Sequence, residues 1–136
     1  MTARSLSGSC LCGAVRYVAS GEEQRFYHCH CTRCRKASGT GHASNLFLQG
    51  TLSWTSGEEL IRSYMPPDAE RFTNTFCEVC GSRVPRFIER LGMVFIPAGS
   101  LDDEPAIRPQ ARIFQGSRAA WSCDDSALPG FDQYAN

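Results

Sequence analysis

The chain has 136 residues, enough for one domain, and 42% of them are apolar, as in ordinary soluble globular proteins. Its 14 basic and 14 acidic residues cancel, so no bulk charge favours nucleic acid or a membrane surface as a partner. No apolar run is long enough to span a bilayer, and residues 1–10 lack the apolar stretch of a signal peptide. We therefore expect a single domain over residues 1–136, located in the cytoplasm.

Short candidate strands follow one another along most of the chain. Alternating side chains predict a strand over residues 14–19, closed by Gly21, and a second strand over residues 24–31. One helical turn fits residues 32–38, before Gly39. Further strands are expected over residues 42–49, 51–56, 58–65 and 70–77, in a hairpin over 83–101 with its turn near 91–92, and over 110–117. No window carries a long helical period, so the pattern favours a mainly β fold.

Seven of the eight cysteines fall in three tight groups, and this placement indicates metal binding. The groups are Cys10 and Cys12; Cys29, Cys31 and Cys34; and Cys77 and Cys80. Cysteines this close together are poorly placed to staple distant loops but well placed to chelate one ion. Without a secretory signal, metal thiolates and a cytoplasmic location are favoured over disulfides. Cys123 stands apart beside two aspartates, and we expect it to be an incidental thiol.

The first and third groups together have the composition of a structural zinc site. Cys77 and Cys80 form a Cys-x-x-Cys-Gly knuckle, and Cys10 and Cys12 form a tighter Cys-x-Cys-Gly turn. Two such pairs supply the four thiolates of a tetrahedral zinc. The alternative, two unrelated pairs of buried thiols, does not explain why both glycine-terminated motifs occur in one chain.

The middle group has an odd number of thiols and indicates a second kind of site. Its members are Cys29, Cys31 and Cys34. Three protein ligands and one free position are the arrangement of a catalytic zinc. A histidine could close the site instead. In an extended backbone His30 points away from its cysteine neighbours, and His28 is awkwardly adjacent to Cys29. His42 could return through a turn and complete a closed site, but we favour the open arrangement.

Three cations surround the last thiol of this group. Arg33, Arg35 and Lys36 flank Cys34, and nearby positive charge favours a thiolate. As a group they would attract a small anionic substrate. The alternative is an ordinary solvated positive face.

Three ordered motifs resemble the glutathione-dependent formaldehyde-activating enzyme family, to which centromere protein V is related. They are "CLCGAVRY", "CHCTRCRKASG" and "FCEVCGS". The resemblance extends to "LSWTSGEELIRSY", "ARIFQGSRAAW" and "LPGFDQY", so it covers most of the chain. Many relatives carry an arginine three residues before the third cysteine group, where this chain has Asn74.

The resemblance implies a mainly β, Mss4-like (β-tent) fold of several short coiled antiparallel sheets stabilised by zinc. It also implies two zinc ions per chain. Cys10, Cys12, Cys77 and Cys80 would hold the structural ion, and Cys29, Cys31 and Cys34 the catalytic one. The implied activity is that of a carbon–sulfur lyase joining formaldehyde to a small thiol, glutathione in the family.

A non-enzymatic, zinc-stabilised binding module is the alternative, since Mss4-like domains include such binders. The open three-cysteine group favours the enzyme, because a scaffold gains nothing from a free coordination position. Nucleic-acid binding is the weakest hypothesis, because no basic run is present.

Overall fold

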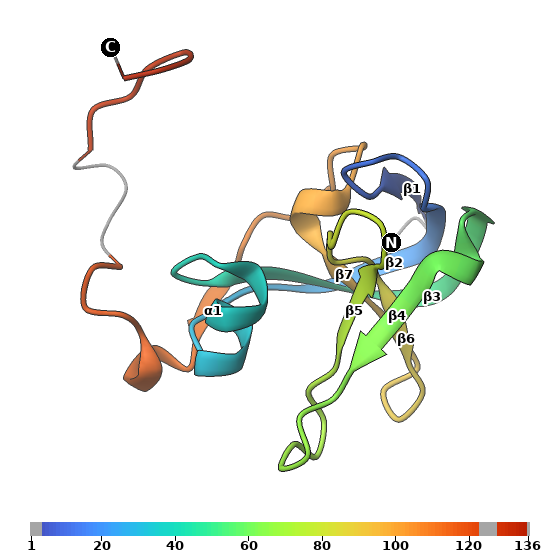
Figure 1. Cartoon of the computed structure of the whole chain (residues 1–136), viewed down its shortest axis with the longest axis horizontal. Coiled ribbons are helices and arrows are strands. Elements are labelled where there is room, and N and C mark those ends of the chain that lie inside the picture. The colour runs from blue at the N-terminus through green and yellow to red at the C-terminus, as the bar shows by residue number, and fades with distance from the viewer. Residues whose placement is uncertain (1–3, 123–127, 136) are drawn as a thin grey trace.

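The computed structural model describes residues 4–122 and 128–135, which form two β-sheets and one short α-helix (Figure 1). The strands are β1 (Arg4–Ser9), β2 (Arg16–Cys29), β3 (Ala43–Ser56), β4 (Ile61–Tyr64), β5 (Asn74–Cys77), β6 (Arg86–Ile88), β7 (Met93–Pro97) and β8 (Ala111–Ile113). The helix α1 spans Thr32–Ser38, and 3-10 turns span Glu58–Leu60, Ala98–Ser100 and Gln115–Ser117. The expected mainly β fold is confirmed.

The larger sheet has six strands, arranged in the order β1-β2-β3-β7-β6, with β8 pairing the end of β2. Neighbours along this path are antiparallel, whereas β8 runs parallel to β2. The two central strands, β2 and β3, have 14 residues each. The helix α1 lies beside the end of β2 and the start of β3 (Figure 1).

The prediction that Gly21 closes the strand over residues 14–19 was wrong, and the strands expected over 42–49 and 51–56 form one strand, β3. Gly21 and Gly50 lie opposite each other inside the β2–β3 ladder, and both strands continue past them. A bulge between Glu23 and Arg25 follows, and it shifts the register of β2 against β3. The expected helical turn, the Cys-x-x-Cys strand and the β6–β7 hairpin are confirmed.

The main core lies on one face of the larger sheet. Its buried side chains come from alternate positions of β1, β2, β3 and β7, which is the period expected for one face of a strand. They are Leu6, Tyr17, Ala19, Phe26, Leu46, Leu48, Val94 and Ile96. Partly buried Leu101 and Ile107 pack against this face, so the segment after β7 helps to cover it.

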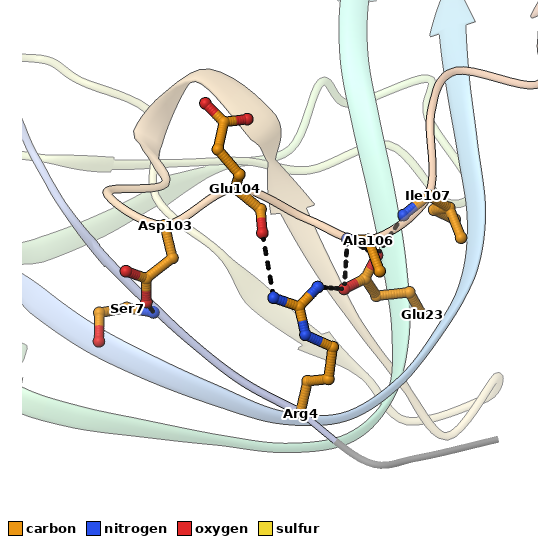
Figure 2. A network of polar contacts seen from close by, with 7 residues as sticks. All are labelled: Arg4, Ser7, Glu23, Asp103, Glu104, Ala106 and Ile107. Atoms are coloured by element: carbon orange, nitrogen blue, oxygen red, sulfur yellow. Dashed lines mark hydrogen bonds and ion pairs between the residues drawn. The ribbon is translucent and has the colours of Figure 1, made fainter.

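A buried carboxylate fastens that covering segment to β2 (Figure 2). Glu23 is only 7% exposed. Its Oε1 accepts hydrogen bonds from the backbone N–H groups of Ala106 and Ile107 at 2.8 and 2.9 Å. Its Oε2 accepts one from Arg4 at 3.1 Å, and Arg4 also donates to the carbonyl of Glu104. The charged side chain is therefore buried with its hydrogen bonds satisfied.

The smaller sheet pairs β4 with β5 and meets the larger one around a second cluster of buried side chains. Val15, next to β2, and Val84, next to β6, are buried there with Cys10 and Cys77. Partly buried Trp54 of β3 packs against them. Two of the predicted metal ligands thus lie in the core that joins the sheets.

The described end of the chain lies apart from these cores. Residues 128–135 are exposed throughout, and Figure 1 draws them in red away from the sheets. Cys123, expected to be an incidental thiol, lies outside the described residues. Within the described ranges, no helix has the length and apolar character needed to cross a bilayer.

Candidate metal centres

Four cysteines that are far apart in the sequence meet at one point of the fold. Cys10 and Cys12 lie in the turn between β1 and β2, whereas Cys77 ends β5 and Cys80 lies in the following turn. All four Sγ atoms are within 4.8 Å of one another, and those of Cys10 and Cys12 are 3.6 Å apart. A tetrahedral zinc with Zn–S distances of about 2.3 Å requires sulfur separations of about 3.8 Å. This donor set therefore fits zinc; the ion itself stays a prediction.

The turn that holds Cys10 and Cys12 and the turn that holds Cys77 and Cys80 have similar backbone geometry. The Gly13 N–H donates to the Cys10 carbonyl at 3.0 Å, and the Gly81 N–H donates to the Cys77 carbonyl at 2.8 Å. Both glycines are left-handed, with φ of 80° and 77°, a conformation that other residues adopt at a cost. Cys10 Sγ also accepts the N–H of Val15 at 3.3 Å. Such backbone donors favour the thiolate form that a metal ligand requires.

The other three clustered cysteines meet where β2 passes into α1. Cys29 ends β2, Cys31 caps α1, and Cys34 lies in the first turn of the helix. Their Sγ atoms are within 4.8 Å of one another, and Cys31 Sγ accepts the Cys34 N–H at 3.3 Å. The side-chain amide of Asn45, on β3, approaches Cys34 Sγ at 3.9 Å. The end of β2 and the first turn of α1 thus bring the three thiols together, and β3 lies next to them.

Without a cation the thiols of a cluster compete for protons. The contact with Cys34 lowers the pKa of Cys29 to about 6, against the effect of burial, and the same contact raises the pKa of Cys34. In the four-cysteine cluster, the Ser82 hydroxyl lies 3.4 Å from Cys80 Sγ and lowers the pKa of Cys80 to about 5. Thiolates this close repel one another, and a metal dication removes that repulsion.

The histidines lie away from the three-thiol cluster. His28 and His30 alternate with Cys29 and Cys31 along the chain, and their rings gather with that of His42 instead. The ring centroids of His28 and His42 are 3.9 Å apart, and those of His30 and His42 are 5.3 Å apart. Burial, followed by His42 and two arginines, lowers the pKa of His30. Among the described histidines, cysteines and acids, none joins the three cysteines as a fourth ligand.

The three thiols open into a cavity of about 920 Å³ with a strongly positive lining. Its cationic residues are Arg25, Arg33, Arg71, Arg83, Arg86 and Arg90, against the acidic Asp68 and Glu70. Aromatic side chains, including Phe72 and Phe95, complete much of the wall. The cavity can therefore accept a small molecule with a negative group and an apolar part.

The cations next to Cys34 in the sequence contribute less to this cavity than expected. Arg33 does line it, and it pairs with Asp68 at 3.1 Å. Arg35 is not part of the lining and donates to the carbonyl of Ser117 instead, and Lys36 is exposed outside it. The prediction of a cationic group formed by all three was wrong, because a helix directs consecutive side chains to different sides.

Several other lining residues were missed from the sequence, and three of them bear on the proposed chemistry. Arg83 and Arg86 come from the segment entering β6, and Asn45 comes from β3. None belongs to a cysteine motif. A weak signal was the pairing of two arginines with apolar neighbours in "RVPRF", which is unusual for a solvated surface.

Comparison with known proteins agrees with the cysteine pattern. The sequence profile described as "Glutathione-dependent formaldehyde-activating enzyme" matches residues 5–117. A Halomonas elongata protein, provisionally named as a glutathione-dependent formaldehyde-activating enzyme, is 34% identical over 114 residues, covering 79% of this chain and 72% of its own. A crystal structure of a Rhodobacter sphaeroides protein, with a TM-score of 0.49 and 20% identity, covers 78% of this chain and 97% of its own. On the profile and the Halomonas relative, the chain belongs to the glutathione-dependent formaldehyde-activating enzyme family.

Proposed function

We propose that the chain holds two zinc ions and catalyses the joining of a small thiol to formaldehyde, as a carbon–sulfur lyase of its family. The observation that carries this proposal is the three-thiol cluster, which opens into a cavity without a described fourth ligand. Three protein ligands and a free position distinguish reactive zinc sites from structural ones. We also retain the cytoplasm as the expected location.

The two clusters have different proposed roles. Cys10, Cys12, Cys77 and Cys80 would hold a structural zinc, whereas Cys29, Cys31 and Cys34 would hold the zinc used in the reaction. When bound there, zinc would keep a substrate sulfur in its thiolate form or polarise the aldehyde oxygen.

The reaction needs little from the protein besides orientation and charge. The thiol sulfur bonds to the formaldehyde carbon, the carbon–oxygen double bond becomes single, and the thiol proton ends on that oxygen. The positive lining of the cavity favours an anionic thiol. Asn45 is 6% exposed and lines the same cavity, and its Oδ1 has no hydrogen-bond partner among the described residues. This oxygen can accept a hydrogen bond from the new hydroxyl group of the product.

The test is exchange spectroscopy on a mixture of glutathione, formaldehyde and their adduct, which interconvert slowly without a catalyst. Zinc-loaded protein at a low molar ratio should accelerate this exchange. Cys34→Ser should remove most of the acceleration, because only two thiols of the cluster remain. His42→Ala is the matched control: its ring contacts the other histidines rather than the thiols, so the acceleration should persist.

Two outcomes would contradict the proposal. Zinc-loaded wild-type protein that leaves the exchange rate unchanged for glutathione and for simpler thiols would favour the binding-module alternative. Loss of zinc from the second site in His42→Ala would indicate that the histidine completes a closed site.

A further inference from the structure

Arg83 and Arg86 enter the cavity from outside all three cysteine motifs. Arg83 Nε donates to Asn74 Oδ1 at 2.8 Å, and Arg86 Nη2 donates to the carbonyl of Arg71 at 3.2 Å. The guanidinium carbons lie 5.6 and 6.0 Å from the centroid of the same ring, that of Phe95. Two guanidinium groups are therefore fixed near one aromatic ring in the wall of the cavity.

Neither guanidinium has an acidic partner among the described side chains. The ion pairs between described side chains use Arg4, Arg33 and Arg62, and none includes Arg83 or Arg86. The Nε atom of Arg86 is buried without a hydrogen-bond partner among the described residues. Partly buried cations are ordinarily paired, because removing a charge from water without a counterion is costly. Among the described side chains, no carboxylate pairs with either guanidinium.

The thiols of the second cluster offset the burial of only one of the two arginines, Arg83. Burial lowers the pKa of both, but the nearby thiols of the second cluster act in the opposite direction on Arg83. For Arg86 the neighbouring charges are Arg90 and Arg83, which lower its pKa further. Arg83 can thus serve as a counterion for the thiolates, whereas Arg86 has repulsive neighbours. An anion that enters with the substrate would relieve this repulsion.

We propose that Arg86, assisted by Arg83, binds a carboxylate carried by the thiol substrate a few bonds from its sulfur. A planar guanidinium matches a carboxylate through two parallel hydrogen bonds. The carboxylate must lie within the reach of one small molecule from the sulfur, because Arg83, Arg86 and the three cysteines line the same cavity. The carboxylate charge then determines which thiols bind tightly in the cavity. This inference rests on the proposed function, since it requires the sulfur to reach the three-cysteine cluster.

The probes are 3-mercaptopropionate and its methyl ester, which differ mainly in the negative charge. Binding is measured on the full chain with cobalt in place of zinc, through the sulfur-to-cobalt absorption, and by calorimetry on the zinc form. Wild-type protein should bind the acid about 10-fold to 100-fold more tightly than the ester, the range for hydrogen bonds between charged groups. Arg86→Gln should remove most of this preference while leaving the ester affinity and the metal content unchanged. Arg86→Lys should restore part of it.

Arg90→Gln is the matched control, because Arg90 lines the same cavity but is exposed, and the substitution removes the same charge. It should keep the preference for the acid. Equal affinity of the wild type for acid and ester would overturn the carboxylate site while leaving the proposed function intact. Equal losses in Arg86→Gln and Arg90→Gln would reduce the effect to bulk charge and also overturn it. If neither thiol changes the cobalt spectrum, the proposed function fails and this inference with it.

Discussion

Glu23 shows how one buried charge can stabilise a segment that has little regular structure. Both carboxylate oxygens accept hydrogen bonds, and every donor is either a backbone N–H or the Arg4 guanidinium (Figure 2). The segment they anchor contains Ile107, which packs on the main core. The carboxylate thus compensates for a stretch of chain that forms few ladder hydrogen bonds of its own.

Glu23→Gln should lower the free energy of unfolding by about 1–3 kcal/mol, the cost of leaving buried hydrogen-bonding groups unsatisfied. An amide replaces one accepting oxygen with a donating NH2 group, which then faces backbone donors. Glu22→Gln is the control, since Glu22 takes no part in the network of Figure 2. Urea unfolding of both variants measures the difference, and equal stabilities would show that the network contributes nothing.

Asn74 illustrates a limit of motif comparison at the scale of one residue. The family resemblance implies an arginine at this position, so the asparagine argues against an anionic ligand such as glutathione. The structure places Arg83 against Asn74, with Nε 2.8 Å from the amide oxygen. A cation therefore does lie at this place, but it belongs to Arg83, nine residues further along the chain. An isolated antiparallel bridge between Phe76 of β5 and Arg83 holds these two segments side by side, and no local pattern predicts that contact.

The long strands β2 and β3 depend on a close approach of two glycines. A Cβ atom built on Gly50 would lie 1.8 Å from the carbonyl oxygen of Ser20, and one built on Gly21 would lie 2.1 Å from that of Gln49. Contacts under 3 Å of this kind involve backbone atoms that cannot rotate away. The glycines therefore let the two backbones approach each other in the middle of the ladder.

Gly50→Ala should destabilise the protein by about 1–3 kcal/mol or more, as expected for overpacking against a backbone. Gly99→Ala is the matched control, because a Cβ atom there meets nothing within 4 Å. Thermal unfolding followed by circular dichroism compares the two variants. A Gly50→Ala protein as stable as the control would mean that the strands can separate locally at little cost.

These glycines also explain which elements the sequence could predict. Gly39 and Gly92 end a helix and form a turn, as glycine usually does, and the predictions for α1 and for the β6–β7 hairpin were confirmed. Gly21 and Gly50 carry the same local signal but serve a contact between strands. A single-sequence pattern cannot distinguish the two uses, because the partner backbone lies about thirty residues away.

At the scale of the whole molecule, the cysteine clusters were more predictable than their surroundings. Each of the three groups is local in sequence, and two of them are glycine-terminated pairs that together supply the four thiolates of one site. The cavity beside the second cluster draws residues from β2, β3, β6, β7 and the segment after β8. Its charge depends on topology, and therefore the sequence pointed to Arg35 and Lys36 instead of Arg83 and Arg86.

The positions of the two clusters predict different consequences for stability. Cys10 and Cys77 lie in the core that joins the two sheets, so a metal there links segments that are far apart in the sequence. Cys29, Cys31 and Cys34 lie within one short strand-to-helix connection. We expect two zinc ions per chain by metal analysis of protein purified without chelators.

Cys77→Ser should therefore prevent folding or greatly lower the melting temperature, because structural zinc contributes about 10 kcal/mol or more of binding free energy linked to folding. Cys34→Ser should lose the second zinc yet keep the circular dichroism spectrum and most of the thermal stability of the wild type. The two substitutions are chemically identical and both sites are buried, so only the position of the cluster differs. Similar melting temperatures for the two variants, with one zinc lost from each, would contradict the division into structural and reactive sites. A wild type holding one ion under saturating zinc would exclude the second site itself.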